Sequence, residues 1–157
     1  MYTKINEKDI IMKLGAIYSK EKTTFTLFSP VADSVFVIFY DKGNDSAETG
    51  RLEMMRTEGE LFGIFSATAE GDLDGVYYTY EVHTSDGIFC SHDPYARACG
   101  VNGHRSMVID LSKTDPDGFA DEDRPKLADP MSMVITEVSI ADVSAGASAH
   151  SRYPGKF

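Results

Sequence analysis

Hydrophobic and polar residues alternate along several short segments of the chain, and turn-forming residues separate these segments. In Thr23–Phe28, Phe25 and Leu27 fall on one side and two threonines on the other, which is the period of a half-buried β-strand. Residues 35–40 (VFVIFY) are apolar at every position. Both sides of this strand should therefore be covered, one by the opposite sheet and one by a long loop or a further domain.

Further strands follow the same pattern as far as Leu111. They are expected at residues 14–18, 51–56, 61–67, 76–82, 88–91 and 106–111. The Asp86-Gly87 pair between two of them is a typical hairpin turn. Short strands that recur about every 8–12 residues between turn signals predict an all-β sandwich.

The C-terminal part changes character. Residues 113–130 contain six acidic residues and three prolines, which is the composition of a linker. Beyond them, Met133–Ile140 is expected to form one orphan strand, whose free edges would invite pairing with its own sandwich or, in a homodimer, with a neighbouring copy. We therefore divide the chain into a lead-in (1–13), a β-sandwich (14–112), the acidic linker (113–130) and a C-terminal segment (131–157).

Three stretches carry a resemblance to a known family: residues 71–82 (GDLDGVYYTYEV), 93–103 (DPYARACGVNG) and 107–111 (MVIDL). They resemble the N-terminal domain of type I pullulanases, which are α-glucan debranching enzymes of glycoside hydrolase family 13. That domain is of the early-set type, similar to carbohydrate-binding modules of family 48. The resemblance runs from Leu14 to Phe157 and implies an immunoglobulin-like antiparallel β-sandwich.

The resemblance also identifies residues 131–157 with the first strand and loop of the catalytic (β/α)8 barrel. Such a barrel needs about 250 residues, so we expect it to be incomplete here. The family's catalytic acids lie on later barrel strands and have no counterpart, and the chain alone should be inactive. Family members read close to YELHVRDFS in this strand, whereas residues 136–144 read TEVSIADVS and keep Glu137, Asp142 and Ser144.

The resemblance is compatible with three functions. The first is a non-catalytic accessory domain that docks on the catalytic barrel and binds or guides chains of starch, glycogen or pullulan. The second is a subunit of a split pullulanase that a second chain completes in trans. The third is a β-sandwich for protein contacts without sugar binding.

Aromatic residues are the candidate carbohydrate contacts, because modules of this family stack sugar rings on aromatic side chains. The chain has no tryptophan. By resemblance to DGxW…HDP, Phe89 in DGIFCSHDP takes the position of the stacking aromatic, with one extra residue before His92. Tyr78 and Tyr80 share one face of a strand. They are either sugar contacts or part of the core or a domain contact.

The segment DPYARA supplies candidate domain-docking residues, Asp93, Tyr95 and Arg97. Asp93 is expected to cap backbone N–H groups of a turn before Pro94. Arg97 is interpreted as a surface ion-pair partner of Asp93 or as a domain contact. The nearby Cys and His residues do not match a common zinc pattern, and we expect no metal and no cofactor; these residues are Cys90, His92, Cys99 and His104.

The net charge narrows the choice of partners. The chain carries a formal charge of −10 at pH 7, and an acidic surface repels nucleic acid and anionic membranes but leaves a neutral sugar unaffected. No apolar run is long enough to span a membrane. Two cysteines and the lack of a secretory signal favour a cytoplasmic location, or a secreted one if a signal has been removed.

Overall fold

The computed structural model describes residues 14–57, 62–123 and 126–156. The predicted lead-in lies outside the described residues, and so do Leu61 of the expected strand 61–67 and Pro125 of the linker. The chain divides into two compact units, residues 1–116 and 117–157, and each is described by itself.

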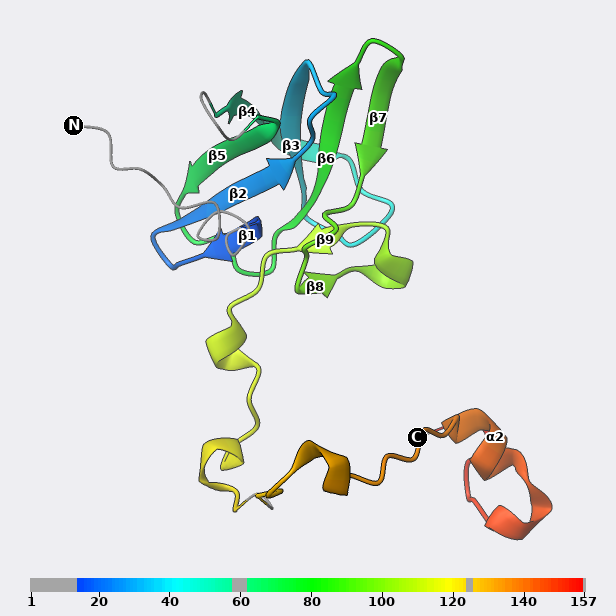
Figure 1. Ribbon diagram of the computed structural model, residues 1–157. Helices are drawn as coiled ribbons and strands as arrows, with labels where there is room; N and C mark the ends of the chain where they lie inside the picture. The colour runs from blue at the N-terminus through cyan, green and yellow to red at the C-terminus, as the bar shows by residue number, and fades with distance from the viewer. Residues whose placement is uncertain (1–13, 58–61, 124–125, 157) are drawn as a thin grey trace. The chain divides into compact units, whose positions relative to one another are not determined.

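The described part of the first unit contains nine strands, and every strand pair is antiparallel (Figure 1). One sheet has the order β1-β2-β5-β4 and the other β4-β3-β6-β9-β8, with β7 paired to β6. β4 joins the two sheets, because its last residues, Met55 and Arg56, pair with β5. The predicted all-β, immunoglobulin-like sandwich is confirmed. The strands are β1 (Gly15–Tyr18), β2 (Lys22–Phe28), β3 (Ser34–Tyr40), β4 (Glu48–Arg56), β5 (Ile64–Glu70), β6 (Tyr77–Thr84), β7 (Gly87–Ser91), β8 (Ala98–Cys99) and β9 (Ser106–Met107).

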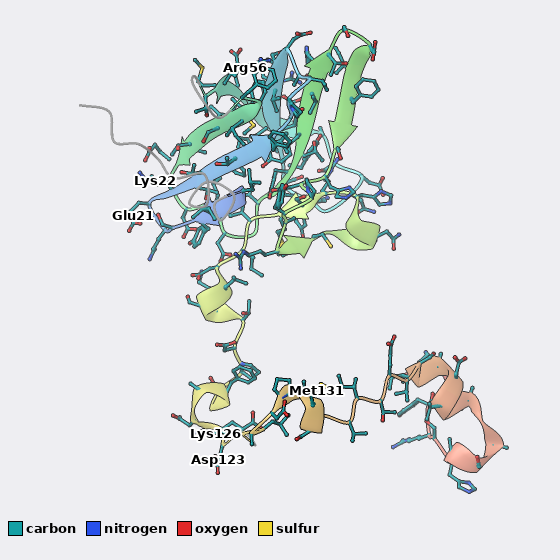
Figure 2. All side chains as sticks on the ribbon, viewed as in Figure 1. Glu21, Lys22, Arg56, Asp123, Lys126 and Met131 are labelled. Carbon is teal, nitrogen blue, oxygen red and sulfur yellow. The ribbon has the colours of Figure 1, made fainter. Side chains whose placement is uncertain are left out.

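The core lies between the two sheets. Phe25 and Leu27 of β2 point into it, as their alternation with threonines predicts. They pack with buried side chains from β3, β5 and β6. The Arg56 guanidinium, which is labelled in Figure 2, donates a hydrogen bond to the Ala32 carbonyl and lies 5.0 Å from the centre of the Phe65 ring.

The second side of β3 is covered by side chains of its own sheet. Ile38 is only 2% exposed and lies between Arg51 and Thr79 in the strand register. The Phe36 ring packs 5.3 Å from His83 and 5.9 Å from the Arg51 guanidinium. Polar side chains of neighbouring strands therefore help to cover the second side of β3. The sequence led us to expect that a loop or a further domain would cover it.

The predicted strand 106–111 was wrong in its second half. β9 ends at Met107, and Leu111–Lys113 is a 3-10 turn. The turn forms because the Asp110 carboxylate accepts the Ser112 N–H at 3.0 Å, which redirects the backbone away from the ladder. The two-residue strand β8, which pairs with β9, was not predicted, because two residues are too few to show alternation.

The strand predicted at Met133–Ile140 was also wrong. In the described part of the second unit this segment lacks a paired strand, and α2 (Ile140–Ala145) begins at its last residue. Apolar composition alone does not make a strand without a partner for its backbone groups. Ser139 instead caps the helix, since its hydroxyl accepts the Asp142 N–H at 3.3 Å. No helix in the described ranges is long and apolar enough to cross a membrane.

Candidate functional site

Asp93 is the centre of a buried polar cluster rather than a surface residue. It is 2% exposed. Its Oδ2 atom accepts hydrogen bonds from the Tyr78 hydroxyl at 2.7 Å and the Tyr80 hydroxyl at 3.3 Å. Its Oδ1 atom accepts the Tyr95 N–H at 2.8 Å, which confirms that Asp93 caps a backbone N–H group of the turn at Pro94. The Asp93 N–H donates to the Ser106 hydroxyl at 2.7 Å.

Tyr78 and Tyr80 belong to the core. Both side chains are almost fully buried, and the Tyr78 ring packs edge-on against Phe25 and against Tyr80. Burial raises the pKa of both hydroxyls above the usual value, and the negative charge of Asp93 raises it further. Neither ring has a free face, so in this structure these two tyrosines contribute no surface to which a sugar could bind.

Phe89 lies at the free edge of β7. Its side chain is 54% exposed, so a ligand can reach it. In the register it is opposite Val82, which packs against the core, while its neighbour Cys90 is opposite Glu81 on the other side of the sheet. Phe89 therefore points to the same side of the sheet as the core, and Cys90 points to the outer side.

Tyr95 and Arg97 are exposed residues on the segment between β7 and β8. Within the described residues Arg97 makes no ion pair with Asp93, whose carboxylate is occupied by the tyrosines. Arg97 instead borders a depression beside the edge strand β1, the β1 depression. It is lined by Ala16, Ile17, Tyr18, Arg97, Ile109, Asp110, Leu111 and Ser112.

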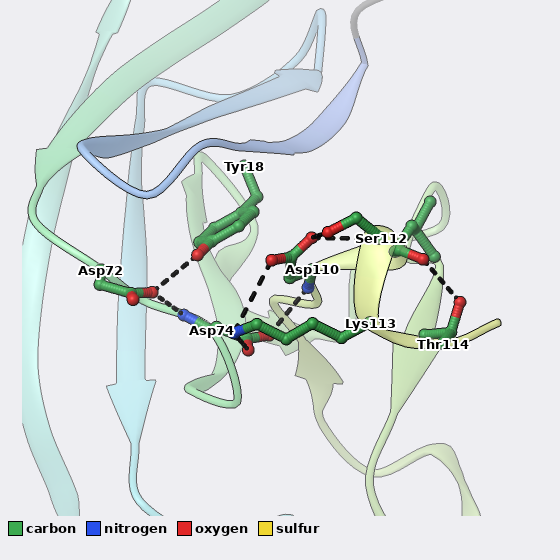
Figure 3. A network of polar contacts seen from close by, with 8 residues as sticks. Tyr18, Asp72, Asp74, Asp110, Ser112, Lys113 and Thr114 are labelled. Carbon is green, nitrogen blue, oxygen red and sulfur yellow. Dashed lines mark hydrogen bonds and ion pairs between the residues drawn. The ribbon is translucent and has the colours of Figure 1, made fainter. Parts of the chain in front are cut away.

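A polar network next to the β1 depression fixes the segment that leaves the sandwich (Figure 3). The Lys113 ammonium lies 2.7 Å from Asp74 Oδ2, and Asp74 Oδ1 accepts the Asp110 N–H at 2.8 Å. The bond from Lys113 lowers the pKa of Asp74. The Tyr18 hydroxyl donates to Asp72 at 2.8 Å, and this bond raises the pKa of Tyr18 to about 12. The network therefore joins the turn before β6, β1 and the exit segment.

The outer side of β6 and β7 carries an open groove that the sequence did not predict. Its volume is about 480 Å3, and we call it the outer groove. It is lined by Thr79, Cys90, Ser91, His92, Asn102, Gly103 and His104. Hydroxyl, amide and imidazole groups dominate this surface, and none of the side chains is an acid, a lysine or an arginine. Such groups both donate and accept hydrogen bonds.

A stacked pair supports one end of the outer groove. The Tyr40 hydroxyl lies 3.2 Å from the Thr79 hydroxyl, and the Arg105 guanidinium lies 3.5 Å from the centre of the Tyr40 ring. Arg105 also donates to the carbonyls of Lys42 and Ser46 at 2.7 and 2.9 Å. The loop between β3 and β4 is thereby held close to the turn 100–103.

Gly100 and Gly43 meet where this loop touches the turn. A Cβ on Gly100 would lie 2.5 Å from the Gly43 Cα atom, although the Gly100 backbone (φ −78°) suits any residue. We expect Gly100→Ala to lower the free energy of unfolding by about 1–3 kcal/mol through this overlap, as measured by urea denaturation. Gly50→Ala is the control, because its Cβ would meet nothing nearer than 4.0 Å. Equal stability of the two variants would contradict the close approach.

A family model matches more than half of the chain. The model of carbohydrate-binding module 48 (isoamylase N-terminal domain) matches residues 13–96. This range includes β1 to β7 and all of the Asp93 cluster except Ser106. Among the residues that the structure describes, no group of three or more His, Cys, Asp or Glu side chains is placed to hold a metal ion.

Several pullulanases are similar to the chain. Pullulanase of Bacillus subtilis (strain 168) is 28% identical over 146 residues, which cover 92% of this chain and 19% of that protein. The structure of pullulanase from Bacillus acidopullulyticus matches with 33% identity and a TM-score of 0.78, over 92% of this chain and 17% of that one. Pullulanase from Paenibacillus barengoltzii in complex with maltohexaose and α-cyclodextrin matches with 35% identity and a TM-score of 0.75, over 86% and 20%. The chain thus spans about a fifth of the length of these relatives.

Proposed function

The chain belongs to the carbohydrate-binding module 48 family, and from this premise we propose that it is a non-catalytic accessory domain that binds α-glucan chains in the outer groove. The observation that supports this most directly is the lining of the groove. A neutral sugar offers hydroxyl groups that both donate and accept, and the exposed amide of Asn102 and imidazole of His104 are suitable partners for them.

The expected affinity is low. The groove lining contains no phenylalanine, tyrosine or tryptophan, and Arg105 stacks on the nearby Tyr40 ring. A few hydrogen bonds of about 1 kcal/mol each correspond to a dissociation constant of about 1 mM. The similar pullulanase of Paenibacillus barengoltzii was solved with maltohexaose and α-cyclodextrin, which supports α-glucans as the ligand class.

We expect maltoheptaose to shift the backbone NMR signals of Thr79, Asn102 and His104, with a dissociation constant of about 1 mM. Asn102→Gly should weaken binding about fivefold, because it removes the amide, whose bonds are worth about 1 kcal/mol. The fold should not suffer, since Asn102 has a φ of 54°, which glycine adopts easily. Phe89→Ala is the control. If Phe89→Ala abolished binding and Asn102→Gly did not, the sugar would lie at the β7 edge instead.

A second candidate function is docking on the remainder of a longer protein. Ile17, Tyr95 and Leu111, at or near the β1 depression, are 42%, 45% and 46% exposed. Exposed apolar side chains that gather in one place mark contact surfaces. The absence of shifts at 10 mM maltoheptaose, about ten times the expected dissociation constant, would favour docking over sugar binding.

A further inference from the structure

β7 forms a free edge of the sandwich. It pairs with β6 on one side, and in the described part of the chain no strand pairs with its other side. All five of its residues are exposed, and Ile88 and Phe89 remain 63% and 54% exposed. Its backbone N–H and C=O groups on the outer edge are therefore available to another strand.

The residues of β7 do not protect this edge from pairing with another strand. Edge strands that stay alone are protected by a charged side chain, a proline or a bulge. The five residues of β7 read GIFCS and include no charged residue and no proline, and their register with β6 is regular. Pairing would bury the large apolar side chains of Ile88 and Phe89.

We propose that β7 pairs antiparallel with β7 of a second copy of this chain, around a two-fold axis through Phe89. Opposite residues of an antiparallel pair point to the same side of the sheet, so a symmetric pair must be centred on a residue and not between two residues. Only the register centred on Phe89 pairs all five residues of one β7 with all five of the other.

The residues that flank β7 are complementary in this register. Phe89 lies opposite Phe89 of the second copy, Ile88 opposite Cys90, and Gly87 opposite Ser91. Asp86 belongs to the two-residue turn that precedes β7 and is therefore outside the ladder, but the pairing of Gly87 with Ser91 brings it beside His92 of the second copy, and the symmetry makes this contact twice. Both residues are exposed in the single chain. The imidazole can donate to the carboxylate and forms an ion pair when it is protonated, which favours a second copy over an unrelated strand.

The pairing has a consequence that depends on the glucan binding proposed above. A two-fold axis between antiparallel strands of one continuous sheet is perpendicular to the sheet. The outer grooves of both copies would therefore open to the same side, and one glucan chain could contact both, which raises the effective affinity. The pairing itself does not depend on sugar binding, and the experiments below contain no sugar.

Sedimentation equilibrium of the 157-residue chain is expected to show a dimer of twice the 17.3 kDa chain mass at about 100 µM. Phe89→Glu places two like charges directly opposite each other and should weaken the dimer at least tenfold. His92→Glu should weaken it about fivefold, because it faces Asp86, and adding Asp86→Lys should restore the dimer. A wild-type chain that remains monomeric at 1 mM, or a double variant no better than His92→Glu, would overturn the proposal.

Disulfide trapping tests the register separately. In a background in which Cys90 and Cys99 are both replaced by serine, Phe89→Cys brings two thiols opposite each other and should form a covalent dimer under mild oxidation. Ser91→Cys is the matched control, because its thiol faces Gly87 of the second copy, and it should remain monomeric on a non-reducing gel. Covalent dimers from Ser91→Cys but not from Phe89→Cys would overturn the proposed pairing.

Discussion

Asp93→Ala is expected to lower the free energy of unfolding by about 3–5 kcal/mol, the range for breaking a buried polar network. The substitution would leave the hydroxyls of Tyr78 and Tyr80 and the N–H of Tyr95 without the acceptor that they share. Each unsatisfied buried group costs about 1–3 kcal/mol. Urea denaturation followed by circular dichroism measures the difference.

A control variant and a double-mutant cycle distinguish the effect of losing the hydrogen-bond network from the effect of losing a negative charge. Asp41→Ala removes an exposed carboxylate and should change the free energy of unfolding by less than about 0.5 kcal/mol. In a double-mutant cycle with Tyr78→Phe, the double variant should be more stable than the sum of the two single effects predicts. A cost for Asp93→Ala below 1 kcal/mol, which is less than one unsatisfied group, would show that Asp93 does not hold these groups.

Only part of the Asp93 cluster could be predicted from the sequence. The capping role of Asp93 was correctly expected from its position before Pro94, because a turn is local. Its bonds to Tyr78 and Tyr80 join positions 15 and 13 residues away, and no local pattern reveals them. The alternation in β6 predicts that Tyr78 and Tyr80 share a side, but the other sheet decides which side is buried.

The sequence predicted strands correctly where apolar and polar residues alternate strongly. The prediction failed where tertiary contacts determine whether a strand forms and where it ends. β2 follows its alternation, whereas β8 and the end of β9 depend on pairing and on the Asp110 turn. The outer groove combines β6, β7 and the turn 100–104. The signal that could have indicated it is Thr79, a small polar residue between two core tyrosines, together with the polar residues of the VNGH turn.

Above about pH 10 the sandwich is expected to lose stability steeply. The pKa of Tyr78 and Tyr80 is raised in the folded chain, first by burial and then by the charge of Asp93, whereas tyrosine in an unfolded chain titrates near about 10. Below that pH both states keep the two protons, and stability is unaffected. Above it the unfolded chain releases them and the folded chain does not, so the free energy of unfolding falls by about 1.4 kcal/mol per pH unit for each tyrosine.

By pH 12 the two tyrosines together should have removed about 5 kcal/mol, which is comparable to the whole stability of a small domain. We therefore expect the phenolate absorbance of these two of the eight tyrosines to appear together with the loss of the β-sheet circular dichroism signal. Tyr80→Phe should reduce the slope of stability against pH by about 1.4 kcal/mol per pH unit, whereas Tyr153→Phe, at an exposed position, should leave it unchanged. Ionisation of all tyrosines near pH 10 with the sheet signal intact would contradict the burial of Tyr78 and Tyr80 against Asp93, since a buried phenolate beside a carboxylate cannot form without first opening the core.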